Sequence, residues 1–211
     1  MREDEKNQTI ERYNKRLEQY GYDPRTLGWT KGKQDIRFNA LIQIAEIRDT
    51  SILDVGCGFG DLYGFLKRKK ISCDYTGIDI NKNLITIGKE KYPEAHLICA
   101  EFENDPFNQE YDWIVSSGMF NHRIKNNMQF IKNSVKKMFK MSKKGVAIDF
   151  ISSYVNFKYE EVYYSNPEAI FRFCKSLSRR VSLKHDYLPF EFCVYIYRHD
   201  QYNQNTEFID K

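Results

Sequence analysis

The sequence lacks any long hydrophobic run. Within its 211 residues no apolar stretch approaches the roughly 20 residues that a membrane-spanning helix needs, so we expect no membrane partner. The N-terminal residues 1–20 are charged throughout and lack the apolar centre of a secretory signal peptide. These two absences predict a cytoplasmic protein.

The sequence also has few cysteines and only a small net charge. The five cysteines are odd in number and widely spaced, which predicts reduced, buried thiols in place of disulfides or zinc ligands. Asp, His and Glu nowhere have convincing metal-ligand spacing, so no metal site is predicted. The net charge is only +4, and the basic clusters at 67–70 and 143–144 fall where helices should end. Nucleic acid is therefore not expected as a partner.

Short β-rich runs alternate with helical patterns along the chain, which is typical of βαβ units and a mostly parallel sheet. Strands are expected at 51–55, 74–80, 95–100, 111–117, 145–152, 180–188 and 190–198. Helices are expected at 5–20, 34–47, 61–70, 83–92, 126–141 and 167–177. The connection around Leu188 and Pro189 is too short for a crossover helix, so the last two strands should form an antiparallel hairpin.

The chain divides into three parts in sequence order. Residues 1–48 hold the first two helical patterns and are expected to form a cap packed on the core, residues 49–200 hold the sheet and its helices, and residues 201–211 form a polar tail. The length fits a single domain overall. The sequence predicts no particular oligomeric state.

Three glycines at alternate positions follow the first strand. The stretch ILDVGCGFGDL, residues 52–62, runs from that strand into a helix, where backbone amides face outward and attract polar or anionic groups. One glycine would satisfy a tight turn. Gly56, Gly58 and Gly60 together leave the backbone bare enough for a ligand to touch it, so this loop predicts a ligand site.

The residue that ends the second strand narrows the choice of ligand. Asp79 can accept hydrogen bonds from two vicinal ribose hydroxyls, and both NAD and S-adenosylmethionine carry such a ribose. Asp61 stands where the third glycine of a dinucleotide-binding G-x-G-x-x-G would be, which weakens the NAD interpretation. The carboxylate alone does not choose between the two ligands.

With these residues the sequence resembles the class I S-adenosylmethionine-dependent methyltransferases. Their first motif, an acidic residue followed by G-x-G-x-G, is matched by DVGCGFG from Asp54 to Gly60, and YTGIDIN and YDWIVSSGMFN add to the match over roughly residues 25–198. The segment LGWTKGKQDIRF is similar to the lead-in of a small bacterial subgroup of largely unassigned substrate. The resemblance implies an α/β, Rossmann-like fold: a seven-stranded, mostly parallel sheet with an antiparallel C-terminal hairpin strand and helices on both faces.

The resemblance also implies which residues bind the cofactor. The glycine loop would lie under its methionyl part, Asp79 would hold the ribose, and Glu101 would meet the adenine amino group. Arg37 would face the cofactor carboxylate, although an ion pair on the protein surface is at least an equal expectation for this arginine. The cofactor residues expected in this way are Trp29, Arg37, Asp54, Gly56, Gly58, Gly60, Asp79, Ile80, Glu101, Phe102, Ser117 and Gly118.

Acceptor and catalytic residues should follow the carboxyl ends of the parallel strands, where open α/β sheets bind their ligands. His122 and His185 are candidate bases for a hydroxyl acceptor, although a single histidine is more often structural than catalytic. Arg123 is a candidate for binding an anionic acceptor. The acceptor wall or lid is expected to include Asn121, Tyr154, Tyr163 and Tyr164.

The expected activity is O-methylation of a small polar metabolite, such as a surface-glycan or natural-product intermediate, with S-adenosyl-L-homocysteine as the other product. In-line displacement needs mainly alignment of the reacting atoms. SSGMFN, at 116–121, does not match the Asn/Asp-Pro-Pro-aromatic motif of many enzymes that methylate nucleic-acid bases. Two alternatives stay open: a non-catalytic protein that binds S-adenosylmethionine, and an NAD-dependent oxidoreductase on the same fold.

Overall fold

The computed structural model describes residues 1–29, 33–107 and 109–199. The polar tail expected from residue 201 lies outside the described residues. In chain order the elements are α1 (Glu3–Tyr20), α2 (Lys33–Ile42), β1 (Ser51–Val55), α3 (Asp61–Arg68), β2 (Asp74–Asp79), α4 (Lys82–Lys91), β3 (His96–Cys99), β4 (Tyr111–Ser116), α5 (Asn127–Met141), β5 (Ser142–Ile151), α6 (Pro167–Lys175), β6 (Val181–Leu188) and β7 (Glu191–Tyr197).

The strands form one seven-stranded sheet in the order β3-β2-β1-β4-β5-β7-β6. β7 runs antiparallel to both of its neighbours, and the other pairs are parallel, so the predicted mixed sheet with a terminal hairpin is confirmed. The strand order reverses between β1 and β4. Open α/β sheets bind ligands beyond the carboxyl ends of their strands at such a reversal.

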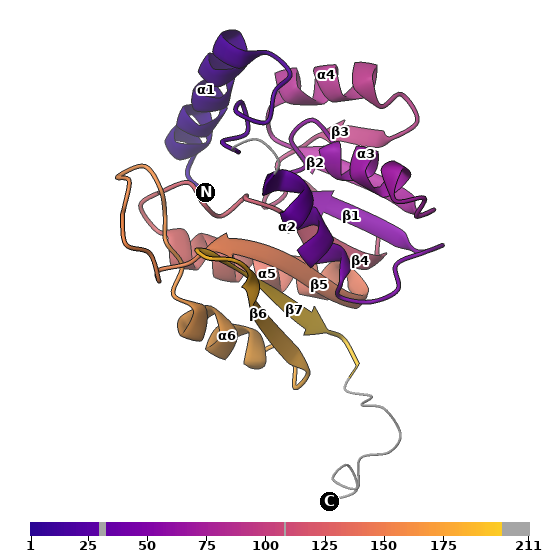
Figure 1. The fold of residues 1–211 in the computed structure, drawn as a ribbon, viewed down its shortest axis with the longest axis vertical. Coiled ribbons are helices and arrows are strands. Elements are labelled where there is room, and N and C mark those ends of the chain that lie inside the picture. The colour runs from indigo at the N-terminus through magenta and orange to yellow at the C-terminus, as the bar shows by residue number, and fades with distance from the viewer. Residues whose placement is uncertain (30–32, 108, 200–211) are drawn as a thin grey trace, which may run out of the picture.

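Helices cover both faces of the sheet, as predicted (Figure 1). One core cluster packs between the sheet and α5 and α6, and a second packs between the sheet and α2 and α3. Successive side chains of one strand pack into the clusters on opposite faces of the sheet. Ile114 of β4 belongs to the first cluster, while Trp113 and Val115 belong to the second. This alternation follows from the two-residue repeat of a strand.

Helix α2 ends five residues before the boundary predicted from the sequence. The hydroxyl of Tyr195 donates a hydrogen bond to the carbonyl of Ala40, and that of Tyr197 donates to the carbonyl of Ile44 at 2.9 Å. These β7 hydroxyls satisfy carbonyls at the end of the helix, which would otherwise lack partners. The chain then turns toward β1 while Ile44 and Ile47 remain in the core.

Helix α1 is attached differently from the other helices. Its buried residues are Glu5 and Thr9, both polar, and it lies beyond the carboxyl ends of the strands, beside α4 (Figure 1). The asparagine that precedes α4 reaches it: Asn81 Nδ2 donates to Asn14 Oδ1 at 3.0 Å. Polar contacts, not a large apolar face, therefore hold α1 in place. No helix in the described parts of the chain is both long enough and apolar enough to cross a membrane.

All five cysteines are free thiols, and Cys57, Cys174 and Cys193 are buried as predicted. Cys99 is a correction, because its side chain is exposed. It is the last residue of β3, which lies at the edge of the sheet, so only one neighbouring strand covers it.

Candidate functional site

A pocket of about 120 Å³ lies at the carboxyl-terminal edge of the sheet, where the strand order reverses. Strand ends form its floor, and the N-terminal helices cover it. The strand ends and the segments that follow them contribute Asp54, Val55, Gly56, Cys57, Gly58, Ile78, Asp79, Ile80, Leu84, Ala100, Glu101, Phe102, Glu103, Ser117, Gly118, Met119, His122 and Phe130. The N-terminal segments contribute Met1, Lys6, Thr9, Tyr13, Leu27, Trp29, Gln34 and Phe38.

The glycine loop and Asp79 meet because of strand register. Val55 pairs with Ile78 in the parallel β1–β2 ladder, so the residues that follow them lie at the same edge. One carboxylate oxygen of Asp79 accepts the N–H of Gly58 at 2.9 Å, and the other accepts the N–H of Asn81 at 2.8 Å. Burial raises the pKa of the Asp79 carboxyl, and these backbone donors oppose the rise.

Gly58 must be glycine for two reasons. Its φ is +57°, in the left-handed region that other residues rarely adopt. A Cβ at this position would also lie 3.0 Å from Leu27, which precedes α2 and lines the pocket. The loop is therefore pressed between the strand ends and the N-terminal cap.

Asp54, the acidic residue of the motif, lies under the loop inside the core. Its carboxylate accepts the hydroxyl of Tyr75 at 2.7 Å. Burial raises its pKa to about 7, against which the Tyr75 hydrogen bond acts. Asp54 also lines the pocket, so an ionisable group lies at the base of the pocket.

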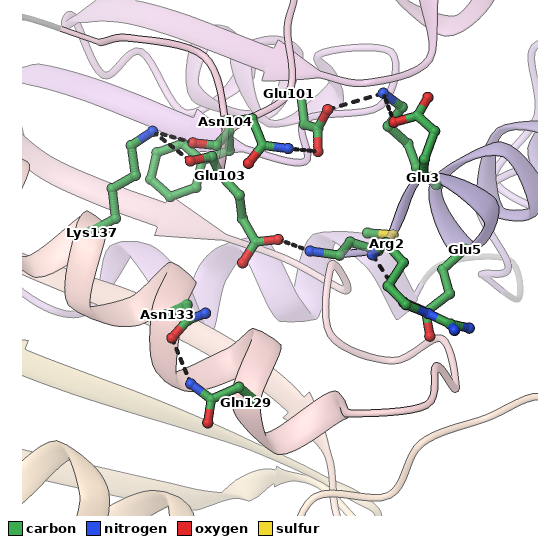
Figure 2. A network of polar contacts seen from close by, with 12 residues as sticks. Arg2, Glu3, Glu5, Glu101, Glu103, Asn104, Gln129, Asn133 and Lys137 are labelled. Carbon is green, nitrogen blue, oxygen red and sulfur yellow. Dashed lines mark hydrogen bonds and ion pairs between the residues drawn. The ribbon is translucent and has the colours of Figure 1, made fainter.

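The segment after β3 is tied to the first turns of α1. One oxygen of Glu101 accepts Lys6 Nζ at 3.0 Å, and the other accepts the side-chain amide of Asn104 at 2.6 Å. Glu103 pairs with the amino group of Met1. Figure 2 shows Glu101 and Glu103 facing the beginning of α1. Glu101 and Phe102 line the pocket, and α1 covers them.

Asp149 fixes the turn after β4. Because Ser116 pairs with Ile148, the next residues of both strands are neighbours. Asp149 accepts the hydroxyl of Ser117 at 2.6 Å and the N–H of Gly118 at 2.8 Å. Burial raises the pKa of Asp149 to about 6. Sequence reasoning missed this residue, although an aspartate inside an apolar strand is the same signal that Asp54 gives.

Trp29 closes one side of the pocket. Gly118 has φ +77°, and a Cβ there would lie 2.5 Å from the Trp29 indole. The guanidinium of Arg37 stacks on the ring of Trp29, 3.9 Å from its centroid. The indole is therefore in contact with the turn after β4 and with α2.

Arg37 itself does not line the pocket. It is 4% exposed and forms a two-pronged ion pair with Glu191 of β7. Of the two expectations for this arginine, the ion pair is the one present here, and it is buried instead of lying on the surface. Its Nη1 has no hydrogen-bond partner among the described residues.

His122 lines the pocket, and its ring is held by α1. Arg12 Nη1 lies 2.8 Å from His122 Nδ1. A guanidinium can only donate, so Nδ1 accepts and the ring is neutral with its proton on Nε2. Burial, followed by the charge of Arg12, lowers the pKa of His122.

The other catalytic candidates lie away from the pocket. Arg123 is not part of the lining, and its guanidinium donates to the carbonyls of Glu160 and Val162. His185 is also outside the lining, packs against the rings of Tyr154 and Phe192, and has a buried Nε2 with no partner among the described residues.

The acceptor-wall candidates and Gly60 are not in the lining either. Asn121 Oδ1 accepts the N–H of Ile151 at 3.0 Å. The hydroxyl of Tyr154 bonds Glu168, that of Tyr164 accepts the N–H of Tyr159, Tyr163 packs against the core, and Gly60 precedes the first turn of α3. Tyr154, Tyr163 and Arg123 thus tie the segment 152–166 to the rest of the molecule, whereas the bond of Tyr164 lies within the segment.

Helix α1 supplies site residues that sequence reasoning did not name. Lys6, Thr9 and Tyr13 line the pocket, and their spacing of three and four residues places them on one helix face. Burial raises the pKa of the Tyr13 hydroxyl, and the nearby Asp79 adds to the rise. The spacing was visible in the sequence, but only the fold shows that this face covers a pocket.

The lining suits an adenosyl ligand. It offers a half-buried carboxylate for a ribose, a second carboxylate beside an aromatic ring for a base, and a backbone cleared of side chains by Gly56, Gly58 and Gly118. Within the described residues, no three His, Cys, Asp or Glu side chains are grouped so that they could hold a metal ion.

Among known proteins, the sequence profile of a family described as a methyltransferase domain matches residues 52–159. A Mycobacterium tuberculosis protein named as a methyltransferase is 31% identical over 156 residues, which cover 69% of this chain and 92% of that protein. The malonyl-acyl-carrier-protein O-methyltransferase of Priestia megaterium is 27% identical over 118 residues, which cover 55% of this chain and 41% of that enzyme.

A solved structure shares the fold. Magnesium protoporphyrin IX methyltransferase from Synechocystis PCC 6803 with bound S-adenosylhomocysteine matches with a TM-score of 0.67 at 12% identity, covering 92% of this chain and 99% of that one. The family match spans half of the chain, and the mycobacterial relative is covered almost completely. This chain therefore belongs to the methyltransferase domain family, whose members use S-adenosylmethionine as the methyl donor.

Proposed function

We propose that this enzyme methylates an oxygen atom of a small polar acceptor, such as an intermediate of surface-glycan or natural-product synthesis. The observation that carries the proposal is the lining of one pocket by the glycine loop, the carboxylate of Asp79 and the imidazole of His122. The Priestia megaterium relative is by name an O-methyltransferase of malonyl-acyl-carrier protein, which favours oxygen as the methylated atom.

Three groups would hold the cofactor. Asp79 would accept the ribose hydroxyls, since its carboxylate lies in the pocket with oxygens that can each take a further donor. Glu101 would accept the adenine amino group, sharing or replacing the contact with Lys6. The backbone at Gly56 and Gly58 would lie against the methionyl part. When bound, S-adenosylmethionine supplies a methyl carbon that exchanges its bond to a positively charged sulfur for a bond to the acceptor atom.

The enzyme's own contribution would be alignment and exclusion of water. The turn Ser117–Gly118, fixed by Asp149, and the indole of Trp29 line the pocket and would border the reacting atoms. Helix α1 covers the pocket from the other side. Holding nucleophile and methyl carbon in line can supply most of the rate gain of such a displacement.

His122 is the base that we propose for a hydroxyl acceptor. It is neutral and lines the same pocket as Asp79. A base is needed because an alcohol must lose its proton as the new bond forms. His185 serves as a matched comparison, since it is a histidine of the same chain that lies outside the pocket lining.

The proposal is tested by incubating the enzyme with S-adenosylmethionine carrying a ¹³C-labelled methyl group and a fractionated bacterial metabolite extract. We expect label in one small polar fraction, with a ¹³C chemical shift typical of a methyl group on oxygen. His122→Asn should lower the transfer rate roughly 100-fold or more while the affinity for S-adenosylhomocysteine is kept, and His185→Asn should leave both unchanged. Label on nitrogen or on a macromolecule contradicts the proposed acceptor. Cofactor binding with no transfer anywhere favours a non-catalytic binding protein.

A further inference from the structure

A hollow on the surface lies beside His122, between α1 and the segment 152–166. Its lining residues are Gln8, Glu11, Arg12, Lys15, Arg16 and Glu161. Arg12 belongs to this hollow and also contacts His122, which lines the cofactor pocket. The side chain of Arg12 therefore stands between the solvent-facing hollow and the proposed base.

Arg12 differs from the other cations of the hollow in its partners. Lys15 pairs with Glu11 at 2.7 Å, and Arg16 donates to the carbonyl of Arg25. Neither Arg12 nor Arg16 has a carboxylate within 4 Å in the described parts of the chain, and what sets Arg12 apart is that its hydrogen bond goes to the neutral imidazole of His122. A guanidinium normally binds carboxylate or phosphate oxygens with two parallel donors. Two carboxylates also line the hollow, but Glu11 pairs with Lys15, and no ion pair joins Glu161 to Arg12 in the described parts of the chain.

The present contact also blocks the proposed base. A general base needs an unshared electron pair within reach of the proton that it takes. The pair on His122 Nδ1 is engaged by Arg12, and Nε2 carries the ring proton. The charged groups facing His122 are Arg12 from α1 and Glu161 from the segment 152–166. His122 can accept a proton only if Arg12 moves away from it.

We propose that the hollow binds an anionic group of the acceptor, a phosphate or a carboxylate, through Arg12, and that this binding withdraws Arg12 from His122. The inference rests on the proposed function and narrows its acceptor to one that carries an anion near the methylated hydroxyl. The hydroxyl proton then moves to Nδ1, giving an imidazolium, and the oxygen keeps the electron pair with which it binds the methyl carbon. Arg12 acts here as a positioning residue that makes the base available only when the acceptor is bound.

The inference is tested on the full chain with isotope-labelled histidine, by following the ring of His122 by NMR in the presence of saturating S-adenosylhomocysteine. Sulfate serves as the anion because it keeps two charges over the whole pH range, and chloride at equal ionic strength is the control. We expect Nδ1 of His122 to be a hydrogen-bond acceptor without sulfate. Sulfate should raise the pKa of His122 saturably, by roughly one unit, because a positive charge leaves it.

Three variants separate the inference from general electrostatic effects. Arg12→Gln should raise the pKa of His122 without sulfate and abolish the response to sulfate. Arg12→Lys should keep part of the response, because it retains the charge but not the paired donors. Lys89→Gln removes an exposed cation at the end of α4 that lines neither the hollow nor the cofactor pocket, and it should leave the sulfate affinity within about twofold of the wild type.

If sulfate does not change the pKa of His122 in the wild-type protein, the inference is overturned. An equal change of this pKa in Arg12→Gln overturns it as well. Either result leaves the proposed function standing, because methyl transfer and the His122→Asn rate are measured separately. Conversely, a wild-type sulfate response combined with no methyl transfer leaves the coupling of Arg12 to His122 intact and refutes the catalytic role.

Discussion

Replacement of Asp79 by asparagine tests whether this carboxylate binds the ribose hydroxyls of the cofactor. The asparagine side chain would occupy the same volume but could not accept hydrogen bonds from two ribose hydroxyls with a full negative charge. Hydrogen bonds to a charged group are worth about 1.5–3 kcal/mol, so the affinity for S-adenosylhomocysteine should fall roughly 10- to 150-fold. Asparagine is preferable to alanine, because its Oδ1 can still accept one of the N–H groups of Gly58 and Asn81, whereas alanine would leave both without an acceptor.

Isothermal titration calorimetry measures this loss, with circular dichroism as the check that the variant is folded. Asp74→Asn is the matched control, since it makes the same change of charge at the opposite end of the same strand. Competition by adenosine and by 2′,3′-dideoxyadenosine isolates the hydroxyls: the wild type should prefer adenosine, and Asp79→Asn should lose most of that preference. A folded Asp79→Asn variant that binds within twofold of the wild type refutes the reasoning.

Three further predictions concern the support of the site. Gly118→Ala should lower cofactor affinity roughly tenfold or more, because the added Cβ would strike the Trp29 indole. Gly21→Ala is the control: its φ is similar, an added Cβ would meet no described atom within 4 Å, and the affinity measured by calorimetry should not change. Equal losses of affinity in the two variants would contradict this prediction. The pKa of Asp149 is about 6 against an ordinary 3.8, so its contribution to stability is complete below pH 3.8 and is lost as the pH rises through 6. Between pH 3.8 and 6, the free energy of unfolding of Asp149→Asn, measured with urea, should therefore rise by about 3 kcal/mol relative to that of the wild type. A difference between the two proteins that does not change with pH would contradict the burial of Asp149. Glu191→Ala should cost about 3–5 kcal/mol in the same assay by leaving a buried guanidinium unpaired, and a loss below about 1 kcal/mol would show that the pair is not buried in solution.

Local sequence patterns predicted the sheet and the glycine loop because both depend on local physics. The apolar run before Gly56 fixes β1, and the register of parallel strands then brings Asp79 to the same edge. The family resemblance added the residues after β3 and β4, and Glu101, Ser117 and Gly118 do line the pocket.

The sequence could not predict contacts made over long separations. Arg12 and His122 are 110 residues apart in the sequence, and the residues around each of them give no pattern that predicts their contact. The ion pair between Arg37 and Glu191, which are 154 residues apart, could not be predicted either, because it too depends on the tertiary fold. His185 shows the limit of motif reasoning: it lies near the end of a strand in the expected place, but its side chain packs against Tyr154 and Phe192 and does not reach the pocket.

If the pocket under α1 is the cofactor site, S-adenosylhomocysteine should change the rates of backbone hydrogen exchange around it. We expect bound S-adenosylhomocysteine to slow exchange in the loop 56–60, at Ile80, at Phe102 and along α1, whose polar contacts should otherwise let it open readily. Binding that protects other segments, while α1 and the glycine loop exchange as before, would place the cofactor elsewhere in the molecule.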